Sequence, residues 1–254
     1  MIIDLNSDLG ESFGNYSIGN DAEVMKYVTS VNIACGFHAG DPLVIEKTIK
    51  LALKNKVAIG AHPGYQDLIG FGRRSMKLKN DELHSLILYQ VGALKAMTEA
   101  LGGKLDHVKP HGALYSDLAY DYNRALAVSE AIYKIDPELI FIGLANSKML
   151  KAAREVGLRA ASEVFADRSY NDDGSLVSRL EEGAVIFDGE ACLEQVNQLI
   201  TNNTVTSING NTIEMNVDTI CVHGDNLKAL EFVKALRKFL TQKNIQLKSL
   251  KDRV

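Results

Sequence analysis

Short β-branched runs alternate with helix-type patterns along almost the whole of this 254-residue chain. Such alternation is typical of repeated βα units, which build a mainly parallel sheet. Helix-start signals support the pattern: Asp41-Pro42 combines an N-cap residue with proline at the first helical position, and Asp225 is a second N-cap candidate. No linker or internal repeat divides the chain, so we expect a single α/β domain over residues 1–254.

Each expected element corresponds to one stretch of the sequence. The strand patterns cover Ile2–Ser7, Ser30–Cys35, Val57–Ala61, Asp106–Lys109, Leu139–Leu144, Leu158–Ser162, Ala184–Phe187 and Thr219–Val222. The helical patterns cover Asp21–Val28, Pro42–Asn55, Asn80–Leu101, Tyr122–Ile135, Ser147–Val156, Glu190–Ile200 and Asn226–Gln242. Within Val205–Asn216, Asn209-Gly210 lies between alternating apolar residues and predicts a tight hairpin before the last strand.

The first strand favours a closed barrel over an open sheet. Asp4, Asn6 and Asp8 share one face because side chains alternate along a strand. A parallel sheet covered by helices on both faces has nearly continuous apolar strands, so this polar row needs wet or hydrogen-bonding surroundings. The mouth of a barrel supplies them. The alternative is an edge strand with one solvated face.

One local pattern occurs four times: a short apolar strand, then a histidine with glycine close by. The four histidines are His38, His62, His111 and His223. Loops that follow barrel strands converge at one rim, so we expect these side chains to share a site there. Any one of them alone is more often a structural residue. His84 and His107 lack the pattern, and we expect both to be structural.

Carboxylates accompany these histidines along the chain. They are Asp8 and Glu11 after the first strand, Asp41, Asp67, Glu163 and Asp225. A carboxylate beside a histidine can fix its tautomer, raise its basicity or complete a metal site. Helix capping explains Asp41 and Asp225 equally well. Helix capping does not explain Asp8 or Glu163, so these two are the stronger candidates for carboxylates that act with the histidines.

Basic residues mark the loops that could hold an anionic substrate group. Arg73 and Arg74 are adjacent in a glycine-flanked loop, Lys109 precedes a histidine, and Arg168 and Arg179 flank a turn-rich stretch. Arginine on a loop suits bidentate capture of a carboxylate or phosphate. The alternative for each arginine is a solvated surface position.

Metal binding is left open by the sequence, because histidine suits both proton transfer and ligation. Barrel metal sites draw single ligands from several strands. The candidate ligands for a divalent cation are Asp8, His38, His62 and His111. The same groups would serve equally as acids and bases without a metal.

Several function classes lose support. A net charge of -4 gives no reason to expect nucleic acid or an anionic membrane as partner. The start lacks the basic segment of a signal peptide, and the three cysteines form no CxxC pair, so we expect a cytoplasmic location. No GxxxxGK[ST] loop, GxGxxG turn or GxSxG elbow occurs, so any ATP used in the reaction should be bound elsewhere.

Seven motifs together resemble the LamB/YcsF family. They are Asp4-Leu-Asn-Ser-Asp-Leu-Gly-Glu-Ser-Phe-Gly14, Asn32-Ile-Ala-Cys-Gly-Phe-His-Ala-Gly-Asp41, Gly60-Ala-His-Pro-Gly-Tyr65, Gly70-Phe-Gly-Arg-Arg74, Val108-Lys-Pro-His-Gly-Ala-Leu-Tyr115, Glu163-Val-Phe-Ala-Asp-Arg-Ser-Tyr170 and Val222-His-Gly-Asp225. The resemblance implies a TIM-like (β/α) barrel, seven-stranded and distorted, of the glycoside hydrolase/deacetylase type.

The resemblance also implies an activity and partners. It points to the A component of an ATP-dependent 5-oxoprolinase, a hydrolase that acts with subunits B and C. Such an enzyme opens the lactam of 5-oxo-L-proline to L-glutamate while ATP, the co-substrate of the complex, becomes ADP and phosphate. This lactam resists hydrolysis, so its opening needs a driving reaction. A chain that has a hydrolytic site but lacks a nucleotide loop fits an enzyme in which another subunit binds the ATP.

These arguments give two sets of expected site residues. The expected catalytic residues are Asp8, His38, His62, His111 and Glu163. The expected substrate-binding residues are Asn6, Glu11, Asp41, Arg73, Arg74, Lys109, Arg168 and His223. In this scheme a histidine is the general base, a second histidine protonates the departing ring nitrogen, and Lys109 steadies developing negative charge.

Two other functions are compatible with the sequence. A stand-alone metal-dependent deacetylase or amidohydrolase acting on a sugar or related amide would work without ATP or partners. A non-catalytic lactam or carbohydrate sensor would bind a ligand without turning it over.

Overall fold

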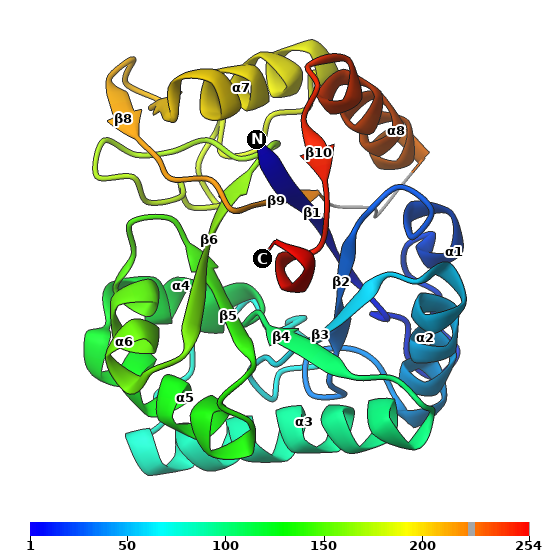
Figure 1. Cartoon of the computed structure of the whole chain (residues 1–254). Coiled ribbons are helices and arrows are strands. Elements are labelled where there is room, and N and C mark those ends of the chain that lie inside the picture. Colours follow the sequence, from blue (N-terminus) through cyan, green and yellow to red (C-terminus); the bar gives the residue numbers. More distant parts are fainter. Residues whose placement is uncertain (223–226, 254) are drawn as a thin grey trace.

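The computed structural model describes residues 1–222 and 227–253. Its centre is a closed ring of seven parallel strands (Figure 1). The strands of the ring are β1 (Ile2–Leu9), β2 (Ser30–Ala34), β3 (Ala58–His62), β4 (Leu105–Val108), β5 (Ile140–Leu144), β6 (Arg159–Phe165) and β9 (Thr219–Val222). Strand β1 pairs with both β2 and β9, which closes the ring and confirms the predicted seven-stranded barrel.

Helices surround this ring on the outside (Figure 1). They are α1 (Asp21–Val24), α2 (Pro42–Asn55), α3 (Asn80–Ala100), α4 (Gly112–Tyr120), α5 (Tyr122–Ile135), α6 (Lys148–Val156), α7 (Gly189–Asn202) and α8 (Leu227–Gln242). Their inner faces bury apolar side chains such as Ile49 of α2 and Ile87 of α3. Since this burial removes apolar area from water, it supplies the main stabilisation of the barrel.

The segment between β6 and β9 departs from a regular βα repeat. It contains a long loop, helix α7 and the antiparallel pair β7 (Thr204–Thr206) and β8 (Thr212–Glu214). This pair confirms the predicted hairpin. The predicted strand Ala184–Phe187 is wrong, because the segment makes only an isolated bridge between Arg168 and Val185 and Phe187 is exposed.

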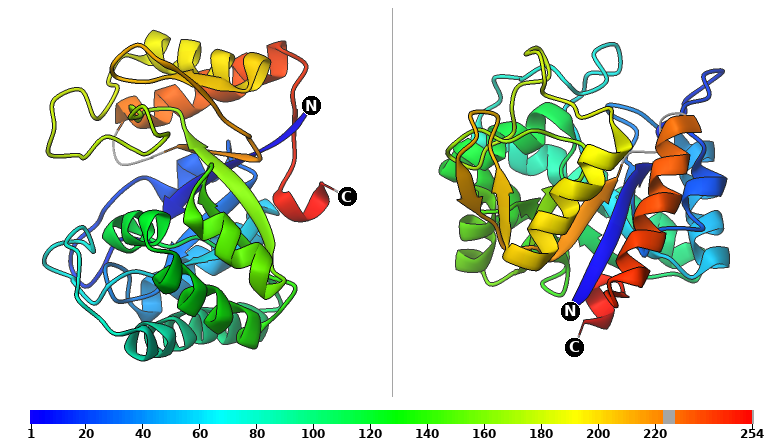
Figure 2. Two further views of the ribbon diagram at one scale, coloured as in Figure 1. Left: turned by 90° about the vertical axis from the view of Figure 1, so that its left-hand side faces the viewer. Right: turned by 90° about the horizontal axis from the view of Figure 1, so that it is seen from above.

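The C-terminal segment closes the amino-terminal end of the barrel. Strand β10 (Gln246–Leu247) pairs with the first residues of β1, and the 3₁₀ turn η1 (Leu250–Asp252) follows it. Leu250 is buried in one cluster with Ile140, Ile142 and Ala161. Figure 1 shows the turn over the centre of the ring, and Figure 2 shows it on the side opposite the long loops. Access to a site in the barrel is therefore from the carboxyl ends of the strands.

The polar row of β1 points into the barrel, as its alternation predicts. Asp4 accepts hydrogen bonds from Ser30 and from Thr219, which lie on the two neighbouring strands. Asn6 and Asp8 both accept from Asn32 at 2.8 Å. Since β1 is paired on both sides, the edge-strand explanation of this row is excluded.

Candidate functional site

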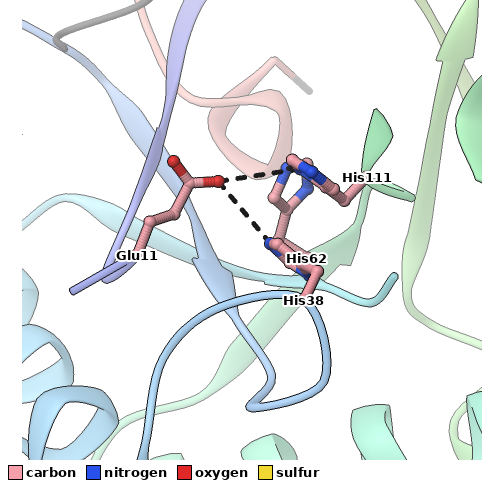
Figure 3. A group of neighbouring side chains, drawn as sticks. All are labelled: Glu11, His38, His62 and His111. Atoms are coloured by element: carbon pink, nitrogen blue, oxygen red, sulfur yellow. Dashed lines mark hydrogen bonds and ion pairs between the residues drawn. The ribbon is translucent and has the colours of Figure 1, made fainter. Parts of the chain in front are cut away.

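Four side chains from the first four strands meet at the open rim of the barrel. Glu11 follows β1, His38 follows β2, His62 ends β3 and His111 follows β4. One potential ligand atom from each lies within 4.8 Å of the others. Figure 3 shows Glu11 reaching toward His38 and His111. The structure thus brings together three of the four motif histidines, while His223 lies outside the described residues.

Backbone carbonyl groups fix the protonation of two of these imidazoles. His62 Nδ1 lies 2.6 Å from the Lys109 carbonyl oxygen, and His111 Nε2 lies 2.8 Å from the Phe71 carbonyl oxygen. A carbonyl oxygen only accepts, so each of these nitrogens carries the proton. The remaining nitrogens, His62 Nε2 and His111 Nδ1, face each other at 3.0 Å.

His38 completes the imidazole cluster from a fully buried position. Its ring stacks on His111 with centroids 3.7 Å apart and planes 5° from parallel. Neither ring nitrogen has a hydrogen-bond partner among the described residues, and Glu11 Oε1 lies 3.5 Å from Nε2. Burial, followed by the neighbouring His62, lowers the pKa of His38 well below its usual value, so its ring is neutral.

Two glycines make room for this stack. A Cβ atom on Gly64 would lie 2.6 Å from His38 Nδ1, and one on Gly72 would lie 2.7 Å from the His38 Cβ. Gly72 also has φ of +61°, which favours glycine. Gly64 of the His62 motif and Gly72 of the loop after β3 are therefore required by close packing inside the site.

Asp8 connects the imidazoles to a buried ion pair below them. Its Oδ2 lies 3.3 Å from His62 Nε2, and its Oδ1 accepts from Lys109 Nζ at 3.0 Å. Lys109 also pairs with Glu163 at 2.8 Å, and both of these side chains are buried. Burial disfavours the ammonium group, but Asp8 and Glu163 outweigh burial and raise the pKa of Lys109 well above its usual value. Lys109 therefore stays charged.

Asn6 lies in the same layer and is fully buried. It donates to Glu163 and Thr219 and accepts from Asn32 and Lys109. All four of these hydrogen bonds are to protein side chains, so this layer supports the groups above it.

Three further residues at the site were not expected from the sequence: Asn32, Tyr115 and Cys221. Asn32 bonds to Asp8, Cys221 Sγ lies 3.0 Å from Lys109 Nζ, and burial together with Glu163 raises the pKa of Tyr115. Asn32 had a sequence signal, because its polar side chain interrupts an apolar strand next to the β1 row. Tyr115 had none beyond its place in a motif, and Cys221 had none beyond its place in the strand before His223.

Three expected substrate-binding residues have structural partners. Asp41 caps α2 through Leu43 N and Val44 N, each at 2.9 Å. Arg74 pairs with Asp67 within its own loop. Arg168 is buried and donates to the carbonyl oxygens of residues 177 and 184, which braces the loop after β6. Burial, followed by Arg179, lowers the pKa of Arg168 to about 10.

The Arg73 side chain is exposed, as is that of Arg74, but it lies against an aromatic ring of the site. Its guanidinium carbon lies 5.3 Å from the centre of the Phe71 ring, which itself packs edge-on against His38 and His111. This places a cation beside the mouth of the site.

The structure is a closed parallel barrel with buried imidazoles and carboxylates at its open rim, and it shares this fold with the catalytic domain of a peptidoglycan N-acetylglucosamine deacetylase from Eubacterium rectale, at a TM-score of 0.51 and 10% identity over 98% of this chain and 88% of that one. The chain belongs to the LamB/YcsF family, whose model matches residues 3–254. It is 54% identical over 248 residues to the A component of the 5-oxoprolinase from Alkaliphilus metalliredigens, covering 98% of this chain and 97% of that protein. It is 54% identical over 252 residues to the protein of that name from Pyrococcus abyssi, covering 99% of both.

Solved structures agree with this assignment. A lactam utilization protein from Thermus thermophilus superposes with a TM-score of 0.93 at 39% identity, over 98% of this chain and all of that chain. A putative cellobiose-phosphate cleavage protein from Enterococcus faecalis superposes at 0.60 with 14% identity, over 96% of this chain and 95% of that one, which shows the shared fold alone. None of the helices in the described residues combines the length and apolar character needed to cross a membrane.

Proposed function

We propose that this chain is the A component of an ATP-dependent 5-oxoprolinase, which opens the lactam ring of 5-oxo-L-proline to L-glutamate. The observation that carries the proposal is identity of 54% over 98–99% of the chain to relatives named as this component. The proposed partners are subunits B and C, the proposed co-substrate of the complex is ATP, and the proposed location is the cytoplasm. In this division of labour the partners activate the lactam and this chain completes ring opening.

Asp8 is the proposed general base for water. Its carboxylate is partly exposed and is held between His62 Nε2 at 3.3 Å and Lys109 Nζ at 3.0 Å. The same carboxyl group can return the proton to the departing ring nitrogen. This proposal moves the base from histidine to Asp8, because the lone-pair nitrogens of His62 and His111 face each other at 3.0 Å inside the cluster.

Lys109 and Glu163 are the proposed positioning residues for Asp8. The Lys109 ammonium group already contacts Asn6, Asp8 and Glu163, and only 2% of its side chain is exposed. The ammonium group holds the Asp8 carboxylate in position through this contact. Arg73 is the proposed ligand of the substrate carboxylate, because a guanidinium at the mouth can form a bidentate pair with it.

Reconstitution tests the proposal. The chain is mixed with subunits B and C, and glutamate and ADP are followed from 5-oxoproline and ATP. We expect product only with all three subunits, and Asp8→Asn should lower kcat by about 10²–10⁴-fold. Asp121→Asn is the matched control, because Asp121 only caps α5 and asparagine caps equally well.

Two outcomes would contradict the proposal. One is the absence of glutamate when all three proteins are folded. The other is amide hydrolysis by the isolated chain without ATP, abolished by a chelator, which would instead identify a stand-alone amidohydrolase.

A further inference from the structure

The cluster of Glu11, His38, His62 and His111 directs atoms with lone pairs at one point. The carbonyl oxygens of Lys109 and Phe71 hold the protons of His62 and His111 on the outer ring nitrogens. The inner nitrogens therefore both present lone pairs, yet they lie 3.0 Å apart. Two lone pairs repel at this distance unless a proton or a cation lies between them.

His38 provides a second, independent sign of a missing partner. The side chain is fully buried, and neither ring nitrogen has a hydrogen-bond partner among the described residues. An unsatisfied buried polar group costs about 1–3 kcal/mol, so a native site normally supplies a partner. Gly64 and Gly72 leave space for the ring in this position, so the packing around His38 maintains the arrangement.

We propose that Glu11, His38, His62 and His111 bind one divalent transition-metal ion, and that Zn²⁺ fits this site. Ligand atoms about 2.1 Å from a tetrahedral zinc ion are about 3.4 Å from one another. The observed separations are 3.0 Å between His62 and His111, 3.5 Å between His38 and Glu11, and 3.6 Å between His111 and Glu11.

The donor atoms select the class of ion. Imidazole nitrogen suits zinc, nickel, copper and iron, whereas Mg²⁺ and Ca²⁺ prefer oxygen ligands. The site is built from three nitrogen donors and one carboxylate. Magnesium supplied with ATP should therefore not occupy it.

Glu11 replaces Asp8 in the ligand set expected from the sequence. Asp8 Oδ1 accepts from both Lys109 and Asn32, which ties this carboxylate to the buried layer. Glu11 Oε1 instead lies between His38 and His111 (Figure 3). The hydrogen bond from His62 Nδ1 to the Lys109 carbonyl oxygen is the outer contact that metal-bound histidines commonly make.

This inference goes beyond the proposed lactam hydrolysis and does not depend on it. A divalent ion at this point would supply Lewis-acid polarisation of a carbonyl or of water. Its presence can be measured on the isolated chain without substrate, ATP or partner proteins.

The test uses untagged protein, freed of metal with a chelator, loaded with Zn²⁺ and desalted. We expect about one zinc per chain by elemental analysis and a rise in Tm, because an ion that binds the folded state stabilises it. Co²⁺ in place of zinc should give the intense visible absorption of a tetrahedral site. His38→Ala, His62→Ala and Glu11→Gln should each weaken zinc binding by at least about 100-fold in calorimetry.

Two matched variants make the test specific. His84→Ala removes a histidine that contacts Lys134 instead of the cluster, and it should keep full zinc binding. Asp8→Asn should also keep full zinc binding, which distinguishes Glu11 from Asp8 as the carboxylate ligand. Circular dichroism and denaturant unfolding of each metal-free variant confirm that it is folded.

The proposal is overturned if folded wild-type protein takes up no more zinc than folded His62→Ala. Retention of zinc by Glu11→Gln together with its loss by Asp8→Asn would overturn the assignment of Glu11. Because uptake is measured on the chain alone, these results stand whether or not reconstitution yields glutamate.

Discussion

Lys109 and Glu163 form an ion pair of 2.8 Å in which both side chains are hidden from solvent. A buried pair is costly to break, because removing one partner leaves the other charge desolvated. The pair lies directly beneath Asp8, so the stability of the barrel interior and the position of the proposed base depend on the same ammonium group.

Replacement of Lys109 by methionine should expose this dependence. Lys109→Met leaves Glu163 without its cation and should lower the free energy of unfolding by about 3–5 kcal/mol in denaturant titrations. The double variant Lys109→Met/Glu163→Gln removes both charges and should be more stable than the single variant. If the losses of unfolding free energy measured for Lys109→Met alone and Glu163→Gln alone add up to the loss in the double variant, the two residues are not coupled.

Gly60 should not tolerate even one methyl group. A Cβ atom there would lie 2.0 Å from His107 Nε2, and the His107 ring cannot move without losing its 2.8 Å contact with Asn32. We expect Gly60→Ala to destabilise the protein by about 1–3 kcal/mol. Gly92→Ala is the matched control: no atom lies within 4 Å of its added Cβ, and in α3 it should stabilise by about 0.5–1 kcal/mol. Equal effects of the two substitutions would contradict the packing argument.

The pair of Asp67 and Arg74 should affect stability in acid. The hydrogen bonds from Arg74, the largest influence, lower the pKa of Asp67 from 3.8 to about 2. Because the folded value is the lower one, the stabilisation is present above the unfolded value and is lost as pH falls from 3.8 toward 2. The difference in stability between wild type and Asp67→Asn, measured by urea unfolding, should therefore shrink over this range. A constant difference would contradict the pairing.

The two adjacent arginines should behave differently in the reconstituted enzyme. Arg73 lies exposed beside the mouth, so Arg73→Ala should raise KM for 5-oxoproline by about 10–100-fold, as expected for a lost hydrogen bond to a charged group. Arg74→Ala breaks a pair within its loop and should change KM less. Equal KM values for Arg73→Ala and wild type would remove Arg73 from the substrate site.

Local sequence patterns predict most of the fold. The ranges Pro42–Asn55 and Tyr122–Ile135 match α2 and α5, because an Asp N-cap begins each helix. Helix α4 is absent from the predicted elements, since its first residue is the glycine of a histidine motif and such a glycine is typical of a loop. The wrong strand at Ala184–Phe187 has a β-branched composition, but no barrel strand lies beside it to pair with.

The sequence predicts part of the site, but not the contacts that depend on strand register or on the path of a loop. Repetition of the histidine motif identifies His38, His62 and His111 because strand ends in a barrel converge. Sequence could not show that Lys109 and Asn6 lie beneath the site, since depth in the barrel depends on strand register. It also could not show that Arg168 donates to backbone carbonyl groups, because that role depends on the path of its own loop.

The loop after β3 is attached to the imidazole cluster through its backbone. The Phe71 carbonyl oxygen holds His111 Nε2, and the Gly72 carbonyl oxygen accepts from Ala113 N at 2.9 Å. If this loop moved away, His111 Nε2 would lose its hydrogen-bond acceptor. The proton could then occupy Nδ1, the nitrogen that faces Glu11. A ligand that requires the inner lone pair would therefore hold the loop in place, and protease resistance or slow amide exchange at residues 71–73 would report whether the site is filled.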